Sequence, residues 1–208
     1  MDAKIKNLIF DVGNVLLEYR WQEMFMDHGL TAEETLELGE KIFQNDIWEK
    51  DMDGGNITAE QAIEKYAEQY PEDKENIAWF IHNAELMVVN RPEIWEKVHI
   101  LKEKGYGIYI LSNYSKELFE MHTKGASFLS ILDGGIVSYQ LHLLKPDEAI
   151  YRALTEKYSL NKEECIFLDD RLENVEASEA FGIHAVQVTS RDMLNEFLDE
   201  MIQNSREE

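Results

Sequence analysis

The chain begins with a short apolar run and then changes to the spacing of amphipathic helices. Lys6–Val12, with its β-branched and aromatic members, predicts a buried first strand that ends at a turn supplied by Gly13. From Tyr19 to about Val88 the apolar residues recur at helical spacing, which predicts helices at Trp21–His28, Thr31–Gln44, Thr58–Tyr70 and Glu72–Met87. The second and third of these open on the pattern of a capping box, Thr31 with Glu34 and Thr58 with Gln61.

The rest of the chain alternates between the two patterns. Helices are predicted at Glu93–Lys104, Ser115–Lys124, Asp147–Tyr158, Glu173–Phe181 and Arg191–Gln203. Strands are predicted at Gly107–Leu111, Gly135–Tyr139, Cys165–Asp169 and His184–Val188. Strands that alternate with helices of this length favour right-handed crossovers and a parallel sheet covered on both faces.

The predicted fold class is therefore α/β, with a doubly wound, Rossmann-like parallel sheet and an inserted all-helical cap. Residues 1–18 and 89–208 would form the Rossmann-like core. Residues 19–88 would form the cap and stand over the carboxyl ends of the strands. The tail, residues 204–208, is expected to fray.

Composition narrows the possible partners. Hydrophobic residues make up 44% of the chain, as in a folded globular protein, and 42 acidic against 20 basic residues give a net charge of −22. Such a charge disfavours binding to nucleic acid or to an anionic membrane surface. A single cysteine, Cys165, excludes an internal disulfide, and no signal peptide or membrane span is recognisable. We expect a cytoplasmic location, and nothing indicates an obligate protein partner.

Polar groups gather at the ends of predicted strands, which is where an open α/β sheet meets its ligands. These residues are Asp11 after the first strand, Ser112 and Asn113 after the second, and Asp169 with Asp170 at a later strand end. Lys145 precedes Pro146 at a predicted helix start. A carboxylate, a hydroxyl, a lysine and a pair of carboxylates suit phosphoryl transfer. Opposed carboxylates also raise one another's pKa, which a hard divalent cation such as Mg²⁺ would relieve.

These motifs resemble those of the haloacid dehalogenase superfamily, whose phosphatases carry an aspartate-rich first motif, a Ser/Thr second, a Lys third and a paired-acid fourth. The likeness extends over nearly the whole chain and includes the position of the helical cap. It implies that Asp11 is a nucleophile that forms an aspartyl-phosphate, and that Ser112 and the Asn113 backbone bind the phosphoryl group. Lys145 would bridge the phosphoryl group and the nucleophile.

The resemblance also implies a metal site. Mg²⁺ would be held by the Asp11 carboxylate, the Gly13 carbonyl and Asp170, with Asp169 assisting directly or through water. Asn174 would support these ligands from one helical turn further on. Gly13 and Asn14 are candidate contacts to the substrate as well.

One position departs from the family pattern. Phosphatases of the superfamily usually carry a second aspartate, a general acid and base, two residues after the nucleophile, where this chain has Gly13. The form Phe-Asp-x-Gly-Asn-Val resembles a branch assigned to sugar-phosphate phosphatases. General acid–base assistance is worth roughly 10²–10⁴ in rate, so its loss slows an enzyme without abolishing catalysis.

The sequence thus predicts a Mg²⁺-dependent phosphatase for a small soluble phosphomonoester, with a sugar phosphate as first choice. A metal-free 2-haloacid dehalogenase is an alternative, although it would leave Asp169 and Asp170 without a role. A phosphate-binding module with little turnover is a third hypothesis. Trp48 and the turn Asp51–Asn56 are suggested to face the site from the cap, and Trp21 is expected to serve cap packing.

Overall fold

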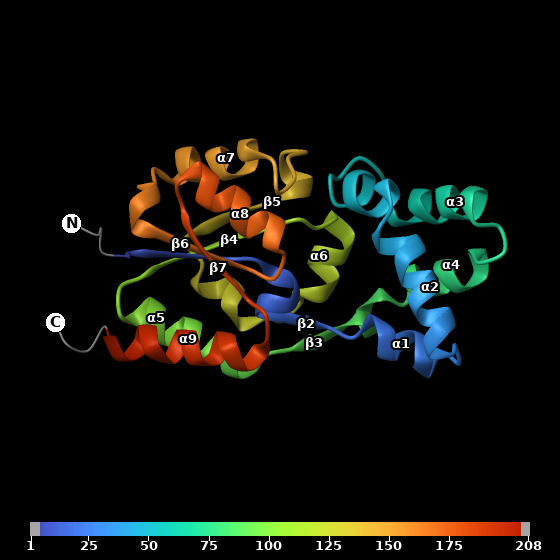
Figure 1. The fold of residues 1–208 in the computed structure, drawn as a ribbon, viewed down its shortest axis with the longest axis horizontal. Helices are drawn as coiled ribbons and strands as arrows, with labels where there is room; N and C mark the ends of the chain where they lie inside the picture. Colours follow the sequence, from blue (N-terminus) through green and yellow to red (C-terminus); the bar gives the residue numbers. More distant parts are fainter. Residues whose placement is uncertain (1–4, 205–208) are drawn as a thin grey trace.

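The computed structural model describes residues 5–204 and builds them around a parallel sheet of five strands (Figure 1). Its spatial order is β5 (Gly134–Val137), β4 (Gly107–Ser112), β1 (Asn7–Phe10), β6 (Cys165–Asp169) and β7 (His184–Gln187). The first strand of the chain is therefore the central one, with the order reversing around it. This is the doubly wound arrangement that the sequence predicts.

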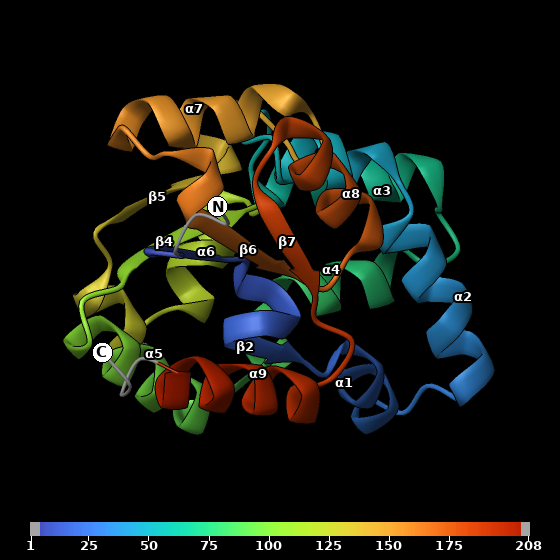
Figure 2. The ribbon, with the colours of Figure 1, turned by 60° about the vertical axis from the view of Figure 1, so that its left-hand side comes forward.

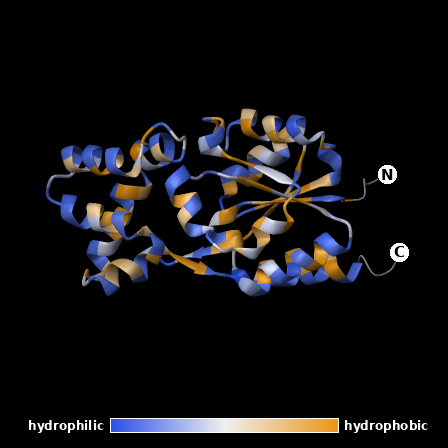
Figure 3. Cartoon of the chain, turned by 180° about the vertical axis from the view of Figure 1, so that it is seen from behind, coloured by the Kyte–Doolittle hydropathy of each residue, from blue (hydrophilic) through white to orange (hydrophobic). Residues whose placement is uncertain are grey.

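Helices cover the sheet on both faces (Figure 2). One face carries α5 (Pro92–Glu103) and α9 (Arg191–Asn204), and the other carries α7 (Glu148–Tyr158) and α8 (Leu172–Phe181). Alternation along β1 sends Leu8 and Phe10 into one apolar cluster and Ile9 into the other. The strands are accordingly among the most hydrophobic ribbons of the molecule (Figure 3).

The strand register brings the predicted polar residues to one edge. Phe10 pairs with Ile110 on one side and with Leu168 on the other. Residues that follow these pairs therefore lie side by side at the carboxyl ends of the three central strands. The backbone N–H of Asp11 still donates to the Leu168 carbonyl at 2.8 Å, so Asp11 leaves the sheet beside Asp169.

A helical insertion, residues 20–87, lies beyond this edge (Figure 1). It contains α1 (Trp21–Asp27), α2 (Ala32–Phe43), α3 (Ala59–Gln69) and α4 (Lys74–His82), with single turns at Ile47–Met52 and Ala84–Met87. Both capping boxes form as predicted, at Thr31 and at Thr58. Outside the insertion the chain adds α6 (Lys116–His122) and short turns at Ser127–Ile131, Ser138–Gln140 and Lys162–Glu164.

Three local features differ from the sequence prediction. The predicted helix Glu72–Met87 is wrong as one element, because α4 begins at Lys74 and stops at Asn83, whose side chain turns back to the Trp79 carbonyl at 2.8 Å. A two-stranded antiparallel ribbon, β2 (Leu17–Tyr19) with β3 (Val88–Asn90), joins core and insertion and is too short to show periodicity. The predicted fraying of residues 204–208 is wrong for Asn204, which ends α9, and its other residues fall outside the described part of the chain.

The third difference concerns the turn that follows β1. Val12–Leu16 forms a distorted helical turn in which Asn14, with φ 52°, and not Gly13, takes the left-handed conformation. Gly13 has φ −66° and ψ 135°, which any residue can adopt, so the prediction that glycine is needed there to end the strand is wrong. The space around Gly13 explains the residue better, as shown below.

Arg91, which directly precedes α5, and Trp95 within α5 hold this turn in place. Arg91, only 5% exposed, donates from Nη1 to the carbonyls of Asn14 at 2.7 Å and Val15 at 3.2 Å. Trp95 donates from Nε1 to the Leu16 carbonyl at 2.6 Å. These bonds satisfy buried carbonyls that an irregular turn leaves without regular helical partners. The loop that carries Asp11 is thereby fixed to the core.

We predict that Arg91→Met lowers the free energy of unfolding by about 2–3 kcal/mol, because buried carbonyls at Asn14 and Val15 would lose their donor. Arg152→Met is a matched control, since Arg152 makes an exposed ion pair with Glu148 on α7. The control should change the free energy by no more than about 0.5 kcal/mol. Urea denaturation of the two variants measures both values, and equal losses would contradict the bracing role of Arg91.

Candidate active site

Polar side chains from four separate segments meet at the carboxyl edge of the sheet. They are Asp11 after β1, Ser112 and Asn113 at the end of β4, Lys145 before α7, and Asp169 and Asp170 at the end of β6. Ser112, Lys145 and Asp169 are buried at 1%, 4% and 0% exposure. The structure therefore brings together the residues that the sequence singles out.

Lys145 lies between two of the carboxylates. Its Nζ is 3.0 Å from Asp11 Oδ1 and 2.5 Å from Asp169 Oδ2. Asp169 is held further by Asn174 Nδ2, which donates to both carboxylate oxygens at 3.0 and 3.1 Å, and by the Arg171 N–H at 2.9 Å. Asp169 is thus an anchor for Lys145, with its oxygens already engaged.

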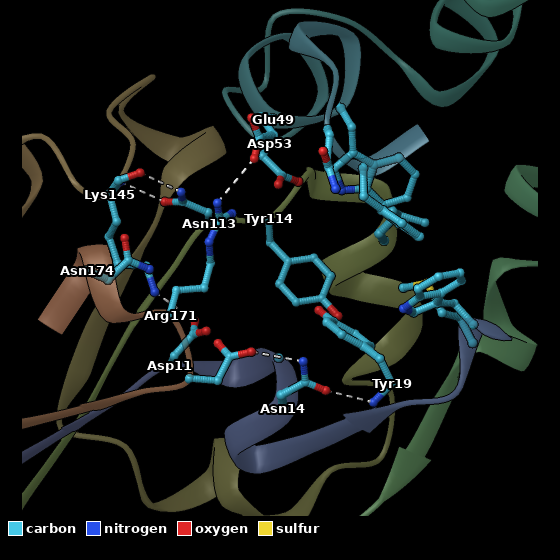
Figure 4. Close-up of a pocket in the computed structure, with 18 residues that line it drawn as sticks. Asp11, Asn14, Tyr19, Glu49, Asp53, Asn113, Tyr114, Lys145, Arg171 and Asn174 are labelled. Atoms are coloured by element: carbon cyan, nitrogen blue, oxygen red, sulfur yellow. Dashed lines mark hydrogen bonds and ion pairs between the residues drawn. The ribbon is translucent and has the colours of Figure 1, made fainter. Parts of the chain in front are cut away.

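Two asparagines hold the remaining parts of the site. Asn113 exchanges two hydrogen bonds of 2.9 Å with the backbone N–H and carbonyl of Lys145, which ties the Lys145 loop to the end of β4. Asn14 Nδ2 donates to Asp170 Oδ2 at 2.9 Å, and Asn14 Oδ1 accepts from the Tyr19 N–H at 3.2 Å. The Asn14 amide therefore orients Asp170 in the cavity (Figure 4).

The electrostatics of the cluster leave negative charge uncompensated. Burial raises the pKa of Asp11 to about 7, with Lys145 opposing the shift and Asp169 and Asp170 adding to it. Burial also raises the pKa of Asp170, while the Asn14 hydrogen bond opposes that rise. Burial alone would lower the pKa of Lys145, but the carboxylates of Asp11 and Asp169 outweigh it and raise that pKa.

The donor set fits a hard divalent cation. One oxygen each from Asp11, Asp169 and Asp170 lie within 4.8 Å of one another. Asp11 Oδ1 is buried and makes no well-aligned hydrogen bond, and the Lys145 ammonium lies 3.0 Å from it. Three carboxylates facing one lysine can hold a cation that takes oxygen ligands.

A cavity of about 370 Å³ opens above these groups and has two chemically distinct ends. Asp11, Asn14 and Lys145 lie at its floor, and Glu49 and Asp53 reach it from the insertion (Figure 4). Further lining residues of the insertion are Trp21, Phe43, Gln44 and Trp48. Trp48 and the Asp53 turn thus face the site as suggested, whereas Trp21, expected only to pack the insertion, lines the cavity too.

The Tyr19 ring occupies the space that a side chain at position 13 would need. A Cβ on Gly13 would lie 2.6 Å from the Tyr19 hydroxyl and ring. Tyr19 belongs to β2, so the ribbon between core and insertion presses an aromatic ring onto the loop of Asp11. The sequence alone does not predict this contact, because nothing local connects a glycine with a tyrosine six residues later. The same holds for Arg91, while Arg171 could have been noted from its position after Asp170.

The chain belongs to the haloacid dehalogenase-like hydrolase family, whose model matches residues 5–182. It is 26% identical over 193 residues to a sesquiterpene phosphatase of Aspergillus oryzae, covering 91% of this chain and 92% of that protein. It is also 25% identical over 191 residues to a drimenol cyclase of Aspergillus calidoustus. This match covers 90% of this chain but only 35% of the cyclase, which is much longer.

Solved structures show the same fold. A family enzyme from Bacteroides thetaiotaomicron, crystallised as a magnesium complex, superposes with a TM-score of 0.69 at 23% identity over 89% of this chain and 94% of that one. The L-2-haloacid dehalogenase of Xanthobacter autotrophicus superposes with a TM-score of 0.64 at 16% identity over 96% and 87%. Among residues 5–204, no helix is both long enough and apolar enough to cross a bilayer.

We predict that Gly13→Ala lowers the free energy of unfolding by about 1–3 kcal/mol, because the added methyl group would overlap the Tyr19 ring. In a Tyr19→Ala background the same substitution should cost at least about 1 kcal/mol less, since the ring is gone. A double-mutant cycle by urea denaturation measures this coupling. If Gly13→Ala costs the same in both backgrounds, Tyr19 is not the reason for glycine at this position.

Proposed function

We propose that this protein is a Mg²⁺-dependent phosphatase that hydrolyses a small phosphomonoester through an aspartyl-phosphate on Asp11. The observation that supports it most is the arrangement at the cavity floor, where Asp11 lies 3.0 Å from a buried lysine and beside a second acidic group, Asp170. A nucleophile, a cation for phosphate oxygens and a metal-binding carboxylate are what phosphoryl transfer requires.

In the first step an Asp11 carboxylate oxygen forms a bond to phosphorus while the bond from phosphorus to the alcohol oxygen breaks. The leaving oxygen takes up a proton and departs as the alcohol. In the second step water attacks the aspartyl-phosphate, loses a proton, and releases inorganic phosphate with the Asp11 carboxylate restored. The phosphoryl group stays at the cavity floor in both steps, so the same rigidly held side chains can position it throughout.

Lys145 would stabilise negative charge on the phosphoryl oxygens while it holds Asp11 in position. Ser112 would donate its hydroxyl to the same oxygens, and the Asn113 N–H would act beside it. Gly13 and Asn14 are proposed as further contacts to the substrate, from the turn next to the nucleophile.

The metal would be held by Asp11, the Gly13 carbonyl and Asp170. Asp169 would assist through water, since its oxygens already bind Lys145, Asn174 and the Arg171 N–H. When bound, Mg²⁺ neutralises charge on the transferring group and on the crowded carboxylates. Asn174 would act through Asp169. The magnesium complex of the Bacteroides enzyme is consistent with this proposal but belongs to that protein.

The domain division predicted from the sequence is part of the proposal. Residues 1–18 and 89–208 would form the catalytic core, and residues 19–88 a cap that closes the cavity over the substrate. The phosphatase relative from Aspergillus oryzae, which aligns over 92% of its length, supports a phosphatase of this overall size. A haloacid dehalogenase remains the second candidate, since dehalogenases share the fold, but it gives no use to Asp170, which Asn14 holds in the cavity.

We predict that the protein releases phosphate from p-nitrophenyl phosphate in the presence of Mg²⁺ and that a chelator stops the release. Asp11→Asn should lower kcat by more than roughly 10³-fold, because the amide has nearly the same shape but is not a nucleophile. Asp192→Asn changes an exposed residue of α9, so it is the control and should keep wild-type activity. Phosphate release by a folded Asp11→Asn protein, or halide release from a 2-haloacid without metal, would contradict the proposed function.

A further inference from the structure

The insertion presents a continuous aromatic wall to the cavity. Trp21 and Phe43 have ring centroids 5.1 Å apart, and Phe43 and Trp48 lie edge to face at 5.0 Å. A Cβ on Gly39 of α2 would meet the Trp21 ring at 2.5 Å, so the absence of a side chain there lets the ring approach the helix closely. These three rings, which we call the aromatic wall, are held by packing and need no ligand to form.

Besides Gln44, the insertion brings two acidic side chains to the same cavity, and both of them already have partners. Glu49 pairs with Arg171 Nη2 at 3.2 Å, and the Asp53 carboxylate accepts a hydrogen bond from the Ser115 backbone N–H. The Glu49 carboxylate would also repel a second anionic group on a ligand. The wall therefore favours an uncharged, apolar ligand part.

We infer that the substrate is a phosphate monoester of an apolar alcohol, whose hydrocarbon part packs against the aromatic wall. This inference rests on the proposed phosphatase function and differs from the sugar phosphate that the Phe-Asp-x-Gly-Asn-Val resemblance suggests. The three rings offer the several hydroxyl groups of a sugar only the two indole N–H donors of Trp21 and Trp48 and no acceptor, whereas a hydrocarbon gains from leaving water over the whole wall.

A matched pair of esters tests the substrate class. Cyclohexylmethyl phosphate and glucose 6-phosphate are both esters of a primary alcohol next to a six-membered ring, so they differ mainly in polarity. We expect kcat/KM for the cyclohexylmethyl ester to be higher by at least roughly 10²-fold. Methyl phosphate, too small to reach the wall, serves as the reference.

Phe43→Gln should lower kcat/KM about tenfold for cyclohexylmethyl phosphate and leave it unchanged for methyl phosphate. Phe43→Leu, which keeps an apolar side chain, should retain most of the preference. Hydrolysis of glucose 6-phosphate as efficient as that of the cyclohexylmethyl ester would overturn the inference while leaving the phosphatase function intact. If no ester, including p-nitrophenyl phosphate, releases phosphate, both the function and the inference fail.

A second observation concerns the proton that the leaving oxygen needs. Gly13 supplies no acid, and burial together with the neighbouring Tyr114 raises the pKa of Tyr19 well above its ordinary value, so the phenol that fills this space holds its proton too tightly. Asp53, by contrast, reaches the cavity from the side opposite the nucleophile (Figure 4). In an in-line displacement the leaving oxygen departs from the attacking one on that opposite side.

The turn that carries Asp53 is fixed to the core. Ser138 donates its hydroxyl to the Asp53 carbonyl, and His142 Nδ1 donates to the Gly54 carbonyl at 2.7 Å. Gly55, at φ +70°, lies so close that a Cβ would meet the Tyr139 backbone at 2.8 Å. The Asp53 carboxyl is thus positioned by core contacts, although it belongs to the insertion.

The charged groups around Asp53 leave it able to hold a proton near neutrality. Burial raises its pKa to about 7, the Ser115 N–H and Arg171 oppose the rise, and Asp11 and Glu49 add to it. Tyr19 and Tyr114, which also face it, are neutral phenols with raised pKa values. An acid of this kind is suited to proton transfer at neutral pH.

We propose that Asp53 is the general acid of the first step, giving its proton to the alcohol oxygen as the bond to phosphorus breaks. In the second step the Asp53 carboxylate takes a proton from the attacking water, so the cycle balances. Phosphatases of the superfamily usually carry their general acid and base at the position of Gly13. In this protein the insertion would supply that group instead.

The test compares good and poor leaving groups. Asp53→Asn should lower kcat by about 10²–10⁴ for methyl phosphate but only a few-fold for p-nitrophenyl phosphate, whose leaving group needs no proton. In the wild type, kcat for methyl phosphate should fall as pH rises above about 7, because the acid loses its proton, and Asp53→Asn should remove this dependence.

Asp46→Asn is the matched control, because it neutralises an exposed acid that precedes the same turn and pairs with Lys50, and it should keep the wild-type response to the leaving group. Asp53→Glu, which retains a carboxyl, should recover part of the methyl phosphate activity. Equal losses for both esters in a folded Asp53→Asn protein, or an unchanged pH profile, would overturn the assignment.

Discussion

The active site depends on the buried ammonium group of Lys145, which lies between two carboxylates. Lys145, 4% exposed, touches both Asp11 and Asp169, and Asp169 is in turn held by Asn174 and by the Arg171 N–H. Charges buried in this way are tolerated only when they are paired and hydrogen-bonded. Further contacts keep these charged groups in position. Asn113 fixes the Lys145 backbone, and Arg91 and Trp95 fix the turn after Asp11.

The same constraint links core and insertion. Tyr19 on the connecting ribbon fills the space at Gly13, and the turn from Asp53 to Gly55 rests on Ser138, Tyr139 and His142 of the core. The floor of the cavity is therefore formed by strand ends and its roof by the insertion. The contacts just named hold floor and roof in position relative to each other. A fold that hosts phosphatases and dehalogenases alike can change its chemistry through such contacts while the sheet stays the same.

The sequence predicts the residues at the floor of the cavity well and those at its roof poorly. Asp11, Ser112 and Asp169 follow apolar strand patterns, and the parallel register brings consecutive strand ends together, so local signals are sufficient there. Trp21 and Phe43 are apolar residues at helical spacing, which looks the same whether the side chain packs a core or lines a cavity. Gly13 was noted as a departure from the family pattern, but the contact with Tyr19 that leaves no room for a side chain there joins residues six positions apart and has no local signal.

In the proposed mechanism Asp11 forms a covalent intermediate, and the stereochemical course of hydrolysis at phosphorus reports on this step. A phosphorothioate ester made chiral with one oxygen isotope, hydrolysed in water carrying another, yields chiral thiophosphate whose configuration can be read. Transfer to Asp11 followed by attack of water comprises two displacements, so we expect retention of configuration. Inversion would mean that water attacks the substrate directly and that Asp11 is not the nucleophile.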